Sequence, residues 1–232
     1  MERKAVFNYF TIPELILWIL SVLSIVLSFC FFGGGNYLTL IASVIGVTSL
    51  IFNAKGNPTG PVLVVVFSVL YGIISFTFSY YGEMITYLGM TAPMAIVTLI
   101  VWLKNPYNGS RSEVTVNKLR RKESVLIFIL TAVVTVAFYF ILKAFNTANI
   151  IPSTISVSTS FLAVYLTFRR SEYFALAYAA NDVVLIVMWI MATVEKLMYL
   201  SVVVCFMAFL ANDIYGYISW RRMYRRQNAA VS

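Results

Sequence analysis

Long apolar segments alternate with short polar breaks along almost the whole chain. The residues from Pro61 to Tyr80 and from Met84 to Leu103 form two such segments. A helix needs about 20 mainly apolar residues to cross the hydrocarbon core of a bilayer, and each of these segments is long enough. The same pattern predicts eight spanning helices, at residues 14–32, 38–54, 61–80, 84–103, 124–143, 150–168, 173–194 and 198–220.

The composition agrees with an all-α integral membrane protein. Of the 232 residues, 61% are hydrophobic and 11% are charged, whereas a soluble domain carries about 25% charged residues. The first segment follows Arg3 and Lys4, as a signal peptide does. However, it contains Glu14, lacks a small-residue cleavage pattern and precedes seven further segments. We therefore expect it to be retained as a helix.

The basic residues test this count of spans independently. The chain has 17 Lys and Arg residues, and with eight spans all of them except Lys143 and Lys196 fall on one side of the bilayer. Positive residues accumulate on the cytoplasmic side, so the pattern predicts a multi-pass protein of the plasma membrane with both termini in the cytoplasm. The net charge of +8 then reflects this topology and contact with anionic lipid headgroups, and it does not indicate a nucleic-acid partner.

The longest polar break, from Lys104 to Ser124, divides the chain near its middle. An offset of about 118 residues places Trp102 on Trp220 and Tyr71 on Trp189, which suggests an internal repeat. Two parallel three-helix repeats joined by a linker helix would be related by an axis along the membrane normal, with solute between them. The predicted parts are an extra N-terminal helix (1–35), the first repeat (36–105), a loop and linker helix (106–148), the second repeat (149–220) and a basic tail (221–232).

Two carboxylates lie deep within predicted spans. Asp182 is near the middle of the seventh span and Asp213 is about 10 Å from the end of the eighth. An acidic residue at such a depth costs about 2.5–3.5 kcal/mol on insertion scales and therefore faces a bundle interior or a wet cavity. Each follows an asparagine, Asn181 and Asn212. These pairs are candidate solute ligands; the alternative is that they only join neighbouring helices by hydrogen bonds.

Aromatic residues complete the candidate site. Trp189 follows Asp182 by seven residues, or two helical turns, so both lie on one helix face. Tyr71 and Tyr215 each precede a glycine, a pair that also permits close helix packing. Trp102, at the end of its span, suits an aromatic belt at the membrane surface as well as a binding role.

Pro93 lies inside the fourth predicted span, where it removes a helical hydrogen bond and predicts a kink. Glu14, Glu83 and Glu172 lie near the ends of predicted spans or in short loops, and we expect them to be interfacial charges. The chain has no histidine, so the usual catalytic base and metal ligand are missing. We accordingly expect no enzyme activity, no cofactor and no metal.

The segment from Asn212 to Trp220 resembles the C-terminal signature of PnuC-type vitamin transporters, in which Asn, two residues, Tyr-Gly, three residues and Trp follow one another. Similar matches occur at Leu70-Tyr71-Gly72, Tyr80-Tyr81-Gly82-Glu83, Leu88-Gly89, Pro93-Met94 and Trp102-Leu103-Lys104-Asn105. The likeness extends from about Val44 to Trp220. The chain departs from the family pattern at Ala95, where the family has Gln, and at Leu99, where it has Trp.

This resemblance implies a SWEET-like, homotrimeric transporter that carries nicotinamide riboside by facilitated diffusion, with a cytoplasmic kinase that traps the solute by phosphorylation. Carried over by position, Asn181 or Asp182, Trp189 and Asn212 would line the pocket, and Tyr215 and Trp102 would support it. The departures leave thiamine, riboflavin or a deoxynucleoside open as the solute. A proton-coupled transporter, a membrane enzyme and a non-transporting receptor subunit are the remaining alternatives.

The topology can be tested by labelling single cysteines from either side of the membrane. Cysteines introduced at Lys143 and Lys196 are expected to react with an impermeant reagent added outside the cell, and one at Lys118 only after the membrane is opened. External protection of Lys143 and Lys196 would contradict the eight-span topology.

Overall fold

A computed structural model describes residues 9–32, 37–77, 80–147 and 149–229 of the chain. Within these ranges eight segments are long and apolar enough to cross a membrane, as the hydrophobic pattern predicts. The helices in chain order are α2 Ile12–Phe32, α3 Tyr37–Ala54, α4 Thr59–Thr77, α5 Tyr81–Thr86, the π-helix η1 Tyr87–Thr91, α6 Ala92–Leu103, α7 Arg121–Ala144, α8 Ile150–Phe168, α9 Phe174–Glu195, the 3₁₀-helix η2 Leu197–Tyr199 and α10 Leu200–Ala229. The predicted boundaries at 35/36 and at 148 lie at residues outside the described ranges.

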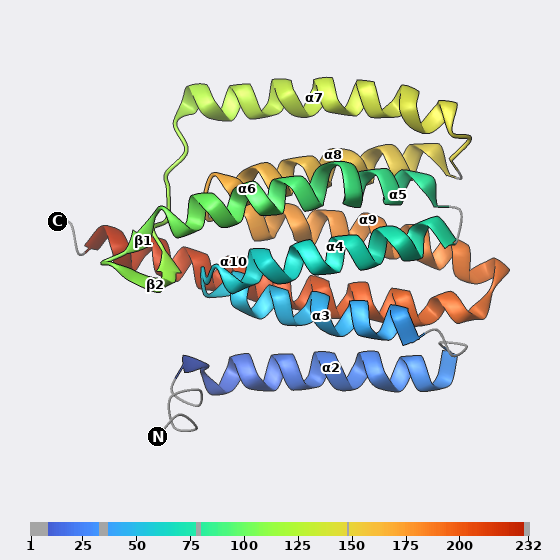
Figure 1. The fold of residues 1–232 in the computed structure, drawn as a ribbon, viewed down its shortest axis with the longest axis horizontal. Coiled ribbons are helices and arrows are strands. Elements are labelled where there is room, and N and C mark those ends of the chain that lie inside the picture. Colours follow the sequence, from blue (N-terminus) through green and yellow to red (C-terminus); the bar gives the residue numbers. More distant parts are fainter. Residues whose placement is uncertain (1–8, 33–36, 78–79, 148, 230–232) are drawn as a thin grey trace.

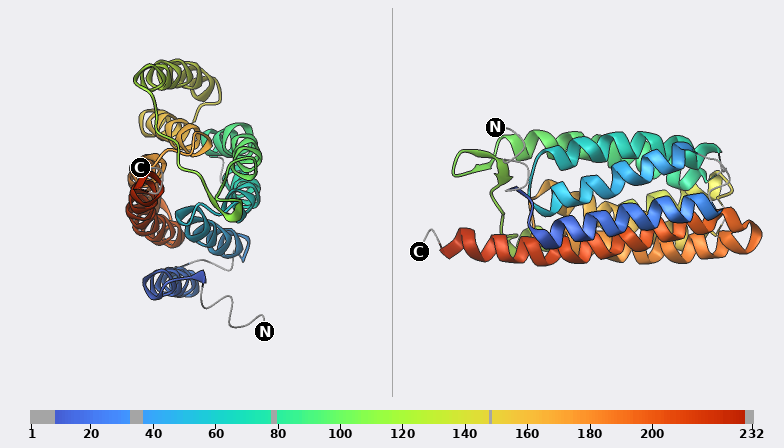
Figure 2. Two further views of the ribbon diagram at one scale, coloured as in Figure 1. Left: turned by 90° about the vertical axis from the view of Figure 1, so that its left-hand side faces the viewer. Right: turned by 90° about the horizontal axis from the view of Figure 1, so that it is seen from below.

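The helices run back and forth along one axis, and the described ends near both termini lie at the same end of the bundle (Figure 1). We call this the terminal end and its opposite the far end. Helices α2 and α7 lie on the outside at opposite sides, α2 against α3 and α10, and α7 against α8 (Figure 2). The remaining helices enclose the core.

The fourth span is interrupted by the π-helix η1, directly before Pro93. Proline has no backbone N–H and its ring collides with the carbonyl oxygen one turn earlier. The wider π turn accommodates this defect within a continuous segment. The predicted disturbance at Pro93 therefore takes the form of a local widening that brings Tyr87 and Thr91 to the core side.

The polar break between α6 and α7 contains a short hairpin, β1 Pro106–Tyr107 and β2 Ser110–Val114, that the hydrophobic pattern did not predict. Asn108 and Gly109 form its turn with φ of 48° and 74°. Positive φ at both positions is the reason that Asn-Gly favours tight hairpins. The turn signal was thus present in the sequence, whereas the strand pairing was not.

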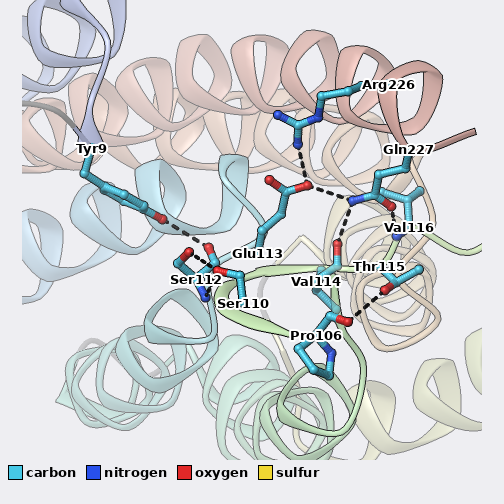
Figure 3. A network of polar contacts seen from close by, with 10 residues as sticks. All are labelled: Tyr9, Pro106, Ser110, Ser112, Glu113, Val114, Thr115, Val116, Arg226 and Gln227. Carbon is cyan, nitrogen blue, oxygen red and sulfur yellow. Dashed lines mark hydrogen bonds and ion pairs between the residues drawn. The ribbon is translucent and has the colours of Figure 1, made fainter. Parts of the chain in front are cut away.

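Helix α10 continues to Ala229, so the residues from 221 to 229 of the predicted basic tail are helical. The extension is held by Gln227, whose side-chain amide bonds to the hairpin (Figure 3). Its Oε1 accepts from the Val116 N–H at 2.8 Å, and its Nε2 donates to Val114 O at 3.1 Å and to Glu113 Oε1 at 2.8 Å. Arg226 also pairs with Glu113. An amide satisfies both a donor and an acceptor, so one side chain fixes the hairpin to α10.

The turns that follow α3 and α8 have the same hydrogen-bond pattern. The Gly56 N–H donates to Asn53 O at 2.9 Å, and the Arg170 N–H donates to Thr167 O at 3.0 Å. Gly56 and Arg170 both have positive φ, of 65° and 55°. Gly56 and Arg170 are 114 residues apart. This offset is about one helical turn shorter than the offset of 118 residues between Trp102 and Trp220.

The last residue of β2 and the chain that follows it contact these two turns. The Val114 N–H donates to Gly56 O at 3.0 Å, and the Asn117 N–H donates to Arg170 O at 2.9 Å. Backbone bonds of this kind satisfy groups that helix ends leave free. Together with Gln227 they tie α3, α8 and α10 at the terminal end.

Replacing Gln227 by Ala should destabilise the protein, because the Val116 N–H and the Val114 carbonyl lose their partner. We expect the free energy of unfolding to fall by about 1–2 kcal/mol, or a loss of about 2–8 °C in Tm, measured by thermal unfolding in detergent. Asn228→Ala, at an exposed neighbouring position, is the matched control. Equal Tm values for the two variants would contradict a role of Gln227 in holding the hairpin.

Candidate functional site

A cavity of about 50 Å³, lined by polar groups and by the apolar side chains of Leu50, Val64, Phe67 and Phe209, lies between α3, α4, η1, α9 and α10. We call it the central cavity. None of its lining residues is basic. Its polar lining residues are Ser49 and Asn53 from α3, Tyr87 and Thr91 from η1, Tyr178, Asn181 and Asp182 from α9, and Asp213 from α10.

Asp182 and Asp213 are 3% and 4% exposed, and their carboxyl groups are hydrogen-bonded to each other. The two helices run in opposite directions (Figure 1), and both residues lie about 20 Å of helix rise from the far end, Asp182 before the end of α9 at Glu195 and Asp213 after the start of α10 at Leu200. Equal depth on neighbouring antiparallel helices brings them together. Oδ2 of Asp182 has no hydrogen-bond partner within the described part of the chain.

Asn181 joins the cavity to α8. Its Oδ1 accepts hydrogen bonds from Thr159 Oγ1 at 2.8 Å, Ser160 Oγ at 3.0 Å and Ser156 Oγ at 3.4 Å. Small hydroxyl residues permit close helix approach and supply donors where water is absent. The run of serines and threonines in α8 is the sequence signal for this contact.

Two smaller cavities, each of about 10 Å³, continue the central cavity in opposite directions. The one toward the terminal end shares Asn53, Thr91 and Tyr178 with it, and the one toward the far end shares Phe67. The three cavities therefore follow one line through the bundle, interrupted by side chains.

Aromatic side chains close the far end of this line. The Trp189 indole N–H donates to the Tyr71 hydroxyl at 3.0 Å, and the Trp189 ring lies 4.9 Å from Tyr80 and 5.5 Å from Tyr199. Trp189 and Tyr71 line the far-end cavity, whereas Asp182 lines the central one. The predicted neighbours Trp189 and Asp182 thus share a helix face but lie at different depths.

Tryptophans close the terminal end. The rings of Trp102 and Trp220 lie 5.5 Å apart and are 1% and 0% exposed. Trp102 Nε1 donates to Thr167 O at 3.0 Å, and Trp220 Nε1 donates to Asn53 O at 2.8 Å. The aromatic-belt interpretation of these residues is wrong, because a belt residue faces lipid and these are buried between helices.

Two predicted pocket residues face the outer helix α2 instead. Asn212 Nδ2 donates to Ser21 Oγ at 2.8 Å, and the Tyr215 hydroxyl donates to Glu14 Oε1 at 3.0 Å. Neither lines the central cavity. Oδ1 of Asn212, 1% exposed, has no hydrogen-bond partner among the residues that the structure describes.

Glu14 and Glu83 lie in the first turns of α2 and α5, near span ends as expected, but both side chains are buried against other parts of the chain. Each is 3% exposed. Glu14 accepts from Lys55 Nζ at 3.1 Å, and Glu83 Oε1 accepts from Ser156 Oγ at 3.3 Å. Glu172, at 8% exposure, pairs with Arg221 at 3.0 Å. Position near a span end did not reveal these contacts, because the partners come from other helices.

Among the described residues no group of three His, Cys, Asp or Glu side chains could hold a metal ion. The polar groups at the core are amides, hydroxyls and carboxyls, which bind a polar solute by hydrogen bonds. With aromatic closures at both ends, the arrangement fits a path for a small solute that is closed in this structure.

Comparison with known proteins agrees with this architecture. The chain is 26% identical over 216 residues to the nicotinamide riboside transporter PnuC of Neisseria mucosa, covering 91% of this chain and 82% of that protein. It is 23% identical to the protein of the same description from Haemophilus influenzae, over 83% of each chain. A crystal structure of the vitamin B3 transporter PnuC has the same fold, with a TM-score of 0.82, 23% identity and 94% of both chains covered.

The family model described as nicotinamide mononucleotide transporter matches residues 36–222. This range contains the candidate membrane spans after α2, the last of them as far as residue 222. The chain therefore belongs to the nicotinamide mononucleotide transporter family.

Proposed function

We propose that the protein carries nicotinamide riboside across the membrane by facilitated diffusion, through the central cavity. The observation that carries the proposal is a polar cavity between two groups of helices, closed by aromatic side chains toward both ends. The two relatives from Neisseria mucosa and Haemophilus influenzae are described as nicotinamide riboside transporters. The family is one of transporters, and the chain is not an enzyme.

The family description names the mononucleotide, which differs from the riboside by a phosphate group. Proteins hold phosphate groups with Arg, Lys or clustered backbone N–H groups. The central cavity has no basic lining residue and contains two carboxyls, which repel a phosphate. This lining favours the riboside over the mononucleotide.

The central cavity is far smaller than the roughly 300–1,000 Å³ of a typical ligand pocket. The cavity must therefore widen to admit a nucleoside, and the line of small cavities indicates where. Trp189 and Asn212 remain in the proposal as residues that meet the solute in the widened site. The unpartnered Oδ1 of Asn212 supports this for its amide.

We further propose that α3 to α6 and α8 to α10 are parallel repeats that rock against each other. The matching turns at Gly56 and Arg170 support this, as does the contact between Trp102 and Trp220, which the repeat pairs with each other. In such transporters the solute binds near midplane between the repeats. The hairpin that ties both turns would have to yield when the terminal end opens.

Orientation, assembly and trapping belong to the same proposal. The charge distribution supports termini on the cytoplasmic side of the plasma membrane. A homotrimer and a cytoplasmic kinase that phosphorylates the solute are supported by the resemblance alone.

Facilitated diffusion predicts flux that stops at equal concentrations. In liposomes containing the purified protein, with the membrane potential held at zero, labelled nicotinamide riboside should enter until inside and outside concentrations match, with or without a sodium or proton gradient. Accumulation that a protonophore abolishes would instead establish proton coupling, and absence of uptake would favour a receptor subunit. Competition by unlabelled thiamine, riboflavin or a deoxynucleoside tests the alternative solutes.

Asn181→Ala should weaken binding of nicotinamide riboside by up to about tenfold, because one amide that lines the cavity is lost. Isothermal calorimetry on the purified protein measures the effect. Ser158→Ala is the matched control, since it removes the 2.7 Å contact with Thr135 between α7 and α8 outside the cavity. Equal affinities of the two variants would place the binding site elsewhere.

A further inference from the structure

The hydrogen bond between Asp182 and Asp213 sets the number of protons that the pair holds. An ionised carboxylate has acceptors only, so two ionised groups cannot form a hydrogen bond with each other. Two carboxyl groups that are buried together in one cavity cannot both carry a charge at low cost, so the pair holds at least one proton. With one shared proton it carries a single negative charge.

Among the described residues no positive group compensates this charge. The lining of the central cavity contains no Lys or Arg, and all Lys and Arg within the described ranges lie in loops, in the hairpin or in the end turns and extensions of helices. The titratable groups that act on the pair are Tyr87 from η1 and Tyr178 and Cys205 from the helices of the pair itself. Glu83 from α5 acts on Tyr87 and is itself acidic. Every one of these groups is neutral or negative.

Two free acceptors add to this negative environment. Asp182 and Asn53 line the central cavity, and Oδ2 of Asp182 and Oδ1 of Asn53 have no hydrogen-bond partner among the described residues. Both residues are more than nine-tenths buried. A buried acceptor without a partner costs about 1–3 kcal/mol, and a buried charge without a partner costs more. Both costs would be removed by a ligand that brings positive charge and donors.

We propose that the Asp182–Asp213 pair is the counter-ion for a permanently cationic solute, which the site selects by its charge. The proposal rests on the function proposed above. Nicotinamide riboside is such a cation, because the ring nitrogen of nicotinamide is bonded to the ribose and becomes a pyridinium. Its carboxamide and hydroxyls supply the donors for the free acceptors.

The charge balance also bears on movement. A cavity with one negative charge and one bound cation is neutral as a whole, so closing it away from water avoids most of the cost of burying an isolated charge. An uncharged solute of the same shape would leave the negative charge alone. The pair would therefore favour closure around the cation, in addition to favouring its binding.

The reduced form of nicotinamide riboside provides the test. Reduction converts the pyridinium to an uncharged dihydropyridine while the ribose and carboxamide remain. Calorimetry on the purified full-length protein is expected to show at least tenfold tighter binding of the oxidised form. In the double variant Asp182→Asn/Asp213→Asn, which keeps the size and hydrogen-bonding groups of the pair but removes its negative charge, we expect this ratio to fall toward one. Each single variant leaves one carboxylate and should keep most of the ratio.

The matched control is Glu83→Gln, at a buried carboxyl that does not line the central cavity, and it should keep the wild-type ratio. If the wild type binds both forms equally, or if the double variant keeps its ratio, the pair is not a counter-ion and the transport function stands. If the wild type binds neither form, the proposed function itself fails. Should the double variant not fold, equal binding of the two forms by the wild type still contradicts the proposal.

Discussion

A polar side chain inside a membrane protein has no bulk water to bond with, and this constraint organises the middle of the bundle. Asp182 bonds to Asp213, and Asn181 collects hydroxyls from α8. The indoles of Trp102 and Trp220 reach carbonyls at the ends of α8 and α3. Each contact joins different helices, so the bonding needs of these groups determine which helices pack together and where a polar cavity remains.

The same constraint explains the two kinds of closure along the path. The faces of an aromatic ring need no hydrogen-bond partner. Only the single N–H of Trp or the hydroxyl of Tyr needs one. At the far end Trp189 bonds to Tyr71, and at the terminal end Trp102 packs on Trp220. Such closures can separate without exposing a charge, whereas the carboxyl pair between them needs a partner or a proton at every stage.

Much of the fold was predictable because the bilayer imposes a simple length rule. Eight spans follow from runs of about 20 apolar residues, and their bounds agree with the helices to within a few residues, apart from the extension of α10. The Asn-Gly turn was also visible. The hairpin around it and the extension of α10 were not, because both depend on the contact between Gln227 and residues more than a hundred positions away.

For the candidate site, the sequence by itself determined which residues are costly to bury, and it singled out Asp182, Asp213 and Asn181 for that reason. The hydrogen-bond and packing partners of each residue became known only from the arrangement of the helices. Asn212 and Tyr215 face α2, Trp189 lines a separate cavity toward the far end, and Glu83 is buried against α8. Burial cost is a property of one residue in one helix, whereas a partner is set by helix rotation and packing, which no single span encodes.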